Sequence, residues 1–298
     1  MEVKYLINPS PTISVVIPTL NRCHTLHRAI DSILKQTTQA KEIIVVDNGS
    51  TDGTSDMVRS HFPMVTYATE VKRGVSAARN KGISIANSPW IAFLDSDDAW
   101  LPTKLEKQIK VCDENNDIRL IHTDEIWYRK GKRVNQMKKH KKRGGNIFDH
   151  CLLLCCISPS SVLMRKDLIK DIGLFDETLP ACEDYDMWLR VTSKEPILFL
   201  DEPLTIKYGG HEDQLSSKFW GMDRFRIYSL EKILSNKSLT PSQAIAARKV
   251  MISKINILIQ GGIKRGNTDI VDIYSKKLNG WVDGRCAFNT SMPQSLSW

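Results

Sequence analysis

The sequence has no apolar run long enough to cross a membrane. No stretch reaches the roughly 18 apolar residues that a membrane-spanning helix needs. The first apolar run, ISVVI at residues 13–17, is also too short for the hydrophobic part of a signal peptide. These absences predict a cytoplasmic protein.

Paired cysteines are lacking as well. The chain has seven cysteines, an odd number, and no two of them are spaced as CxxC. Cys155 and Cys156 are adjacent. This pattern argues against a disulfide framework and favours reduced thiols in a cytosolic protein.

Acidic residues are missing from one segment, residues 129–143, which holds nine Lys or Arg. Subtracting these nine from the net charge of +8 leaves −1, so the rest of the chain is close to neutral. Such a cationic segment suits an acidic substrate, an anionic membrane surface or nucleic acid, or it is a solvated loop. A peripheral position at the inner face of the membrane is therefore open.

Short apolar runs alternate with helical patterns in the first third of the chain. The runs at 13–17, 43–46 and 90–94 show no polar alternation, which is typical of strands covered on both faces. Apolar residues at helical spacing lie between them. The alternation predicts an α/β fold with a mostly parallel, Rossmann-like central sheet flanked by helices.

Polar residues follow each of these predicted strands, at 18–21, 47–50 and 95–98. Open α/β sheets bind their ligands outside the carboxyl ends of the strands. If the strands are parallel, the three polar clusters therefore share one rim of the sheet.

The third cluster crowds Asp95, Asp97 and Asp98 into four positions. A turn or a helix N-cap accounts for one or two of these acids. A turn does not explain why three acidic or amide clusters follow three strands. Two carboxylates at positions i and i+2 can both face one hard cation such as Mg²⁺ or Mn²⁺, which prefers oxygen ligands and relieves the mutual repulsion of the carboxylates. We favour the cation.

The pattern changes after residue 102. It predicts separate strands at 118–122 and 125–129, and a second pair at 197–203 and 204–211. From residue 215 onward the pattern is helical, with breaks near 235–241 and at the glycine pair 261–262. A C-terminal helical extension follows from this pattern.

Five segments together resemble the family 2 inverting glycosyltransferases with the GT-A fold. They are ISVVIPTLNR, IIVVDNGSTDGT, GVSAARNKGI, FLDSDDAWLPTKLEKQI and EDYDMWLR. The resemblance implies a GT-A domain over residues 1–212, in which about 12–125 binds a nucleotide sugar and about 126–212 binds the acceptor. Residues 213–298 would then be the helical extension, covering the acceptor site or mediating self-association.

The resemblance also implies the substrates. The donor would be a nucleotide-diphosphate sugar, with UDP-sugars first among them, and the acceptor a glycan or a lipid-linked glycan in cell-surface glycan or polysaccharide biosynthesis. The residues implied to hold the donor are Pro18, Thr19, Asn21, Asp47, Asn48, Gly74, Arg79, Asp95 and Ser96. Leu20 stands where many relatives stack an aromatic residue on the base, and this departure leaves the base open.

The metal motif of the family corresponds to residues 95–97. Asp97 and Asp95 are the implied ligands of Mg²⁺ or Mn²⁺, with Asp98 as a substitute for Asp95. His211, which follows a predicted strand and two glycines, is a further candidate ligand. The ion would stabilise the departing diphosphate as a Lewis acid.

The segment EDYD resembles the catalytic loop of the family. Asp184 is the implied base that deprotonates the acceptor hydroxyl, and Glu183 is implied to hold the acceptor or the loop. From the residues alone, acids that favour a helix N-terminus are the preferred explanation of this segment; the resemblance favours the base.

Two other functions compete with this interpretation. A sugar-phosphate nucleotidyltransferase would carry a glycine-rich loop after the first strand, whereas residues 18–30 contain no glycine. A nucleic-acid binder acting through residues 129–143 would be expected to show a known docking motif or interleaved aromatic residues, which this segment lacks.

Overall fold

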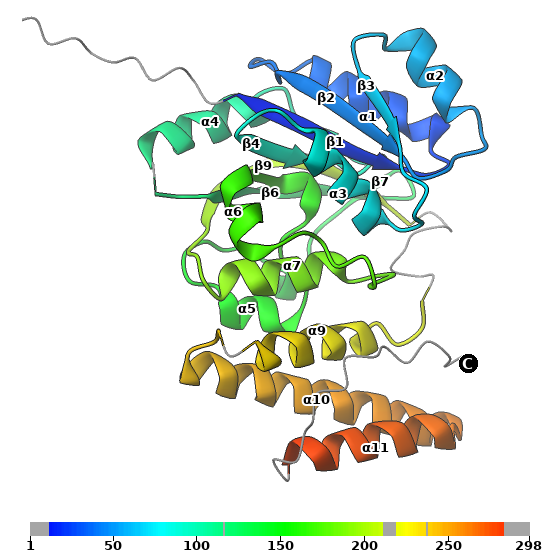
Figure 1. Ribbon diagram of the computed structural model, residues 1–298, viewed down its shortest axis with the longest axis vertical. Coiled ribbons are helices and arrows are strands. Elements are labelled where there is room, and N and C mark those ends of the chain that lie inside the picture. The colour runs from blue at the N-terminus through cyan, green and yellow to red at the C-terminus, as the bar shows by residue number, and fades with distance from the viewer. Residues whose placement is uncertain (1–11, 116, 211–218, 237, 283–298) are drawn as a thin grey trace, which may run out of the picture.

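A computed structural model describes residues 12–115, 117–210, 219–236 and 238–282 (Figure 1). Its centre is a mixed sheet with the strand order β3-β2-β1-β4-β8-β6-β9-β5, and β7 pairs with β6 outside this path. The strands are β1 Ile13–Thr19, β2 Glu42–Asp47, β3 Thr66–Thr69, β4 Trp90–Phe93, β5 Ala99–Trp100, β6 Leu120–Arg129, β7 Lys132–Val134, β8 Val162–Arg165 and β9 Leu198–Gly209.

The first four strands of the chain are parallel to one another, as the alternating pattern predicts. β1 pairs with both β2 and β4, and β3 pairs with β2. Every residue of β1 and β4 is buried, because helices cover both faces of this half of the sheet. The carboxyl ends of β1 and β2 therefore lie at one rim, and the loop after β4 reaches the same rim.

The second half of the sheet differs from the prediction in its strand lengths. β6 and β9 are each continuous, although the sequence indicated two shorter strands in each place. The polar residues in the middle of β6 do not end the strand, because the pairing with β9 shifts register on both sides of Asp124. This irregularity lets the backbone pairing between β6 and β9 continue past the polar residues.

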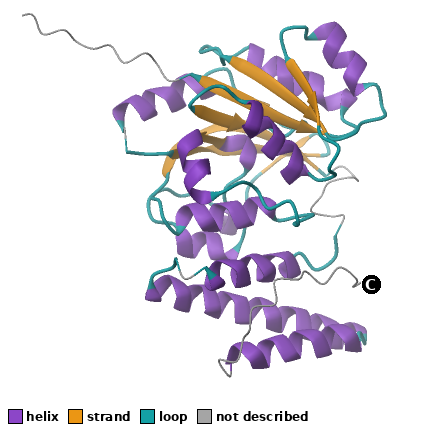
Figure 2. Cartoon of the chain, viewed as in Figure 1, coloured by secondary structure: helices purple, strands orange, loops and turns teal. Residues whose placement is uncertain are grey.

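Helices lie in layers on the two faces of the sheet (Figures 1 and 2). One face is covered by α1, α2 and α4, and the other by α3, α5, α6 and α7. These helices are α1 Cys23–Leu34, α2 Thr54–His61, α3 Val75–Ile85, α4 Lys104–Glu114, α5 Phe148–Leu153, α6 Lys166–Ile172 and α7 Glu183–Thr192.

Three further helices stack beyond α5 and α7, away from the sheet (Figure 1). They are α9 Asp223–Ser235, α10 Pro241–Arg265 and α11 Thr268–Val282. α10 runs without interruption through Gly261 and Gly262, so the predicted break there is wrong. A side chain on Gly262 would lie 3.0 Å from Val271; the glycine lets α11 pack closely against α10.

Within the described residues, no helix is both long and apolar enough to span a bilayer.

Candidate functional site

The rim loops are held together by the side chain of Asn48. Its Nδ2 donates to the carbonyls of Glu70 and Lys72, at 2.9 and 2.7 Å, and its Oδ1 accepts from the amide of Gly74 at 2.7 Å. These bonds join the end of β2 to the end of β3 and to the start of α3. Asn48 thus shapes the rim through backbone groups, and its predicted contact with a donor stays a prediction.

Asp47 ends β2 and is buried. One of its oxygens accepts from the amides of Gly49 and Ser50 at 3.0 and 2.7 Å, and the other accepts from the hydroxyl of Tyr67. Burial and the bond to Asp47 raise the pKa of Tyr67 to about 12. Tyr67 therefore stays protonated and keeps donating to Asp47 near neutral pH.

The end of β1 meets the loop after β2. Asn21 accepts from the amide of Thr51 and donates its own amide to the hydroxyl of Ser50, both at 2.8 Å. Thr19, at the end of β1 after Pro18, has a buried hydroxyl with no hydrogen-bond partner among the described residues. A buried hydroxyl of this kind is available to a ligand at the rim.

Arg79 joins the loop after β4 to the start of α7. Its guanidinium is almost fully buried and lies 2.8 Å from Asp95 and 2.6 Å from Glu183. The structure thus brings together two predicted site residues, Asp95 and Glu183, through a third. A guanidinium suits this bridge because its planar fork offers several donors to two carboxylates.

Neighbouring charges shift the pKa values of Asp95 and Glu183. Burial raises the pKa of Asp95, but Arg79 and then Lys207 lower it below its usual value. Burial and the neighbouring Asp184 raise the pKa of Glu183, although Arg79 opposes them. Asp95 is therefore ionised, as a cation ligand must be.

Asp98 points into the protein. Its carboxylate is buried and accepts from the Ser160 hydroxyl at 2.6 Å and from the Tyr208 amide at 3.2 Å, and it lies 3.1 Å from the ammonium of Lys207. Burial raises the pKa of Asp98 to about 7, although Lys207 opposes this effect. These contacts give Asp98 a structural position beneath the loop.

Asp95 and Asp97 are both half-buried, and Ser96 between them is buried. The carbonyl of Asp97 accepts from Arg28 of α1 at 2.5 Å, which fixes the loop on its other side. The two half-buried carboxylates therefore belong to a loop that is held by α1, α3 and the second half of the sheet.

Asp184 lies at the first turn of α7 and is half-buried. Two positions earlier, Cys182 has a φ of 62°, which turns the chain into the helix. The Oδ1 of Asp184 accepts from the amide of Tyr185 at 2.7 Å. Burial and then Asp184 raise the pKa of the Cys155 thiol well above its usual value, so this thiol stays protonated beside the carboxylate. Trp188 is buried in the core beneath.

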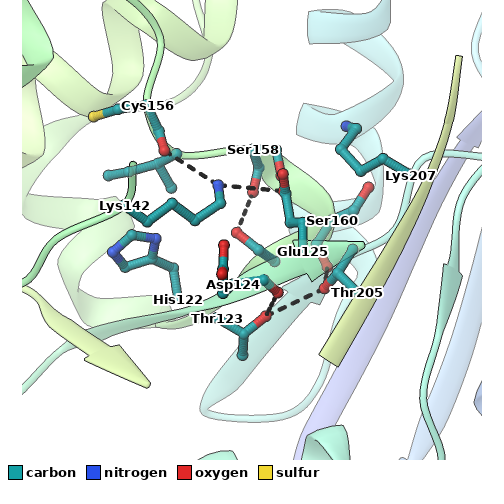
Figure 3. Close-up of polar contacts among 12 residues, drawn as sticks. His122, Thr123, Asp124, Glu125, Lys142, Cys156, Ser158, Ser160, Thr205 and Lys207 are labelled. Atoms are coloured by element: carbon teal, nitrogen blue, oxygen red, sulfur yellow. Dashed lines mark hydrogen bonds and ion pairs between the residues drawn. The ribbon is translucent and has the colours of Figure 1, made fainter. Parts of the chain in front are cut away.

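Sequence reasoning missed a second polar cluster beside the rim, which Figure 3 shows. Glu125 of β6 and Lys142 are both buried and lie 3.3 Å apart, and Lys207 of β9 lies between this cluster and Asp95. No local pattern signalled this cluster. Glu125 stood at the start of the predicted strand 125–129, and Lys142 looked like one more cation of residues 129–143.

No group of three or more His, Cys, Asp or Glu side chains converges as a ready metal site in the part of the chain that the structure describes. His211 lies outside the described residues.

The model of the family described as "Glycosyl transferase family 2" matches residues 14–173. This range contains both carboxylate-bearing strand ends and most of the sheet. The chain belongs to glycosyl transferase family 2.

Curated relatives of this family 2 member differ in length from it. An uncharacterized glycosyltransferase of Rickettsia felis is 34% identical over 201 residues, which is 65% of this chain and 32% of the relative. The chain thus spans about a third of that protein. The glucosyltransferase WfgD of Escherichia coli is 31% identical over 187 residues, which is 60% of this chain and 69% of the relative. WfgD is named for transfer from UDP-Glc to α-D-GlcNAc-diphosphoundecaprenol.

Solved structures share the fold of this family 2 member. TarS residues 1–349 of S. aureus, crystallised with UDP-GlcNAc, align with a TM-score of 0.63 at 18% identity, over 92% of each chain. The mannosyltransferase PcManGT of Pyrobaculum calidifontis, in complex with GDP-Man and Mn²⁺, aligns with a TM-score of 0.56 at 14% identity, over 92% of this chain and 85% of that one. The GT-A fold predicted from the sequence is confirmed.

Proposed function

We propose that this chain transfers a sugar from a nucleotide-diphosphate sugar, with UDP-sugars first among the donors, to a hydroxyl of a glycan or lipid-linked acceptor. The observation that carries the proposal is the bridge from Asp95 through Arg79 to Glu183. This bridge supports the proposal because it joins the loop after β4, residues 94–98 (the donor loop), to the start of α7, which the family resemblance implies to be the catalytic loop. WfgD, which uses a UDP-sugar, supports the donor class.

The donor would lie across the ends of β1, β2 and α3. The buried hydroxyl of Thr19, which has no partner in the described part of the chain, and the rim backbone around Asp47 and Gly74 suit the polar groups of a nucleoside. Arg79 holds Asp95 in place and contributes a permanent positive charge near the diphosphate. In this assignment Pro18, Asn21, Asn48 and Ser96 shape the rim around the donor.

The residues fit a divalent cation whose remaining ligands would come from the phosphates of the donor. Asp95 and Asp97 offer oxygen ligands on one loop, and Mg²⁺ is commonly held by one or two carboxylates together with substrate phosphates. The side chain of Asp98 is only 1% exposed, whereas that of Asp95 is 24% exposed, which favours Asp95 as the partner of Asp97. When bound, Mg²⁺ or Mn²⁺ would neutralise charge on the departing diphosphate. PcManGT, crystallised with Mn²⁺, supports this choice of ion.

Asp184 would act as the base. Its carboxylate would accept the proton of the acceptor hydroxyl while the acceptor oxygen forms a bond to the anomeric carbon. The bond from that carbon to the diphosphate breaks on the opposite side, so the configuration inverts. Glu183, held by Arg79, positions the loop that carries Asp184.

The proposal also assigns a role to each part of the chain. Residues 12–125 would bind the donor and residues 126–212 the acceptor, while the helices α9 to α11 brace the acceptor half. We place the enzyme in the cytoplasm, at the inner face of the membrane, where lipid-linked acceptors are found.

Replacing Asp184 with Asn tests the base directly. Asn keeps the size of the side chain but cannot take a proton, so kcat should fall by about 10²–10⁴ while donor affinity changes little. Turnover is measured with a panel of UDP-, GDP- and dTDP-sugars on glycan acceptors, and donor affinity by calorimetry. Asp149→Asn, on the exposed side of α5, is the matched control. Turnover of Asp184→Asn near the control value would refute the assignment.

Replacing Asp97 with Ala tests the cation site. We expect Mn²⁺ to raise the donor affinity of the unmodified chain and to have at least tenfold less effect on Asp97→Ala, because one of two carboxylate ligands is gone. Calorimetric titrations with and without Mn²⁺ measure both affinities, and Asp113→Ala, at an exposed position of α4, serves as the control. An equal gain from Mn²⁺ in Asp97→Ala would rule out this site.

A further inference from the structure

One of the nine cations in residues 129–143 is buried. Lys142 is only 4% exposed in its side chain; its ammonium donates to the carbonyl of Cys156 at 3.2 Å and lies 3.3 Å from Glu125. The hydroxyl of Ser158 also donates to Glu125. A buried ion pair is favourable only when further hydrogen bonds satisfy it, and here they do. The pair pins the end of the cationic segment to β6 (Figure 3).

The other eight cations are exposed: Arg129, Lys130, Lys132, Arg133, Lys138, Lys139, Lys141 and Arg143. No acid lies between them in the chain. A solvated loop would not need a buried ion pair to hold its position. The pair at Lys142 therefore holds the end of this run of cations beside β6.

Trp127 connects this segment to the rim. Its indole N–H donates to Glu125 at 2.8 Å, and its ring centroid lies 5.3 Å from that of His140, in the short 3₁₀ turn Lys138–His140. Trp127 pairs across the sheet with Lys207 of β9, whose ammonium lies 3.7 Å from Asp95. One face of β6 and β9 thus leads from the donor loop, over a half-buried indole, to the exposed lysines.

We infer that this face is the acceptor subsite, and that the acceptor is a sugar which carries a phosphate or diphosphate. This inference rests on the proposed function. An indole face offers an amphipathic platform for a sugar ring, and beyond it Lys138, Lys139 and Lys141 would bind the phosphate oxygens as point charges. The sugar would then present its hydroxyl towards the donor loop while its phosphate faces the cationic segment.

The test uses octyl diphosphate, a short-chain lipid diphosphate that carries no sugar, as the probe. Calorimetry is run in EDTA, so that no divalent cation can hold the probe at the donor loop. We expect saturable one-to-one binding by the unmodified chain. The triple variant Lys138→Ala, Lys139→Ala, Lys141→Ala should weaken it at least tenfold. The matched control replaces the exposed Lys110, Lys249 and Lys264 with Ala, which makes the same change in net charge, and it should bind as the unmodified chain does.

Vesicles separate the two sources of phosphate. Binding to phosphatidylglycerol vesicles without one-to-one binding of octyl diphosphate would overturn the inference in favour of docking on lipid headgroups. Equal weakening in the control triple variant would also overturn it, because the effect would then be net charge alone. Binding of UDP with Mn²⁺ is measured in parallel. Its survival in the triple variant shows that a failed acceptor subsite leaves the proposed donor site standing.

Discussion

Arg79 shows how a single residue can organise a site. Its guanidinium is buried between Asp95 and Glu183, and its charge lowers the pKa of both carboxyls against the opposite effect of burial. Removing one partner of such a buried group typically costs 3–5 kcal/mol, because the remaining charges lose their compensation. The same side chain thus supports both the stability of the rim and the alignment of its two loops.

His122 lies beneath the second cluster and is fully buried. Its Nε2 lies 2.8 Å from the carbonyl of Arg143, so we assign the proton to Nε2, and its Nδ1 has no partner among the described residues. Burial, and after it the charge of Lys142, lowers the pKa of His122 to about 3. The folded chain therefore holds this imidazole neutral.

This depressed pKa predicts a loss of stability in mild acid. The unfolded chain binds a proton at His122 once the pH falls below about 6.5, whereas the folded chain does not. The free energy of unfolding should therefore fall by about 2 kcal/mol from this residue between pH 7.5 and pH 5. In His122→Gln, which can still donate to Arg143, that part of the loss should vanish, as measured by urea unfolding at both pH values.

The exposed His24→Gln is the control for this measurement and should behave like the unmodified chain. If His122→Gln lost as much stability between pH 7.5 and pH 5 as the unmodified chain, His122 would not be the group that titrates.

At this scale, sequence motifs predicted candidate residues but not their partners in the fold. Asp95, Asp97 and Asp184 were identifiable because each lies in a short motif at a predicted element end. Glu183 and Arg79 are 104 positions apart, and only the fold could show that they meet. Asp98 looked equivalent to Asp95 in the sequence, because burial beneath a loop leaves no local signal.

At the scale of elements, α3 sits unusually close to β1. A side chain on Gly82 would lie 2.3 Å from Cγ1 of Val16 and 3.0 Å from Cγ2, so the helix backbone itself contacts the strand. This contact sets the height of α3 above the sheet. Since α3 carries Arg79, the close approach also helps set the position of Arg79 at the rim.

Gly82→Ala should therefore destabilise the chain by about 1–3 kcal/mol, although alanine favours helix by about 1 kcal/mol. Val16→Ala opens the space that the new methyl group needs. The double variant should be more stable than the sum of the two single effects predicts, by about 1 kcal/mol or more. Urea unfolding of the four proteins measures this coupling.

Gly261→Ala is the matched control, because Gly261 is also in a helix but would meet only the flexible end of Arg265. It should be neutral or mildly stabilising. Additive effects of Gly82→Ala and Val16→Ala would contradict the contact.

Element lengths were the least predictable part of the fold. The sequence divided β6 and β9 at polar residues, yet each strand continues because the register shift accommodates them. The sequence also predicted a helix end at Gly261 and Gly262, whereas the helix continues there and Gly262 lets α11 pack closely against it. In both cases a contact with another element overrides the local preference.

At the scale of the whole molecule, the C-terminal helices share a core with the sheet. One continuous cluster of buried side chains includes Val16 of β1, Tyr185 of α7 and Ile255 of α10. Lys254 adds a polar tie, donating to the carbonyl of Leu153 at 3.1 Å and pairing with Asp223 at 3.0 Å. The helical pattern of the C-terminal residues was predictable, but their packing was not. The spacing of apolar residues predicts a helix but does not show which element the helix packs against.

The shared core predicts that the chain unfolds as one unit. Ile255 is fully buried, so Ile255→Ala should lower the free energy of unfolding by about 2–5 kcal/mol. The loss should appear at the same urea concentration in far-ultraviolet circular dichroism, which reports all helices, and in donor binding, which reports the rim. Ile257→Ala, at a side chain 56% exposed on the same helix, should change stability by less than about 0.5 kcal/mol. Two separate transitions in Ile255→Ala, with donor binding unaffected by the first, would show that α9 to α11 form an independent module. A single shifted transition would mean that any change weakening these helices also weakens the rim far from them.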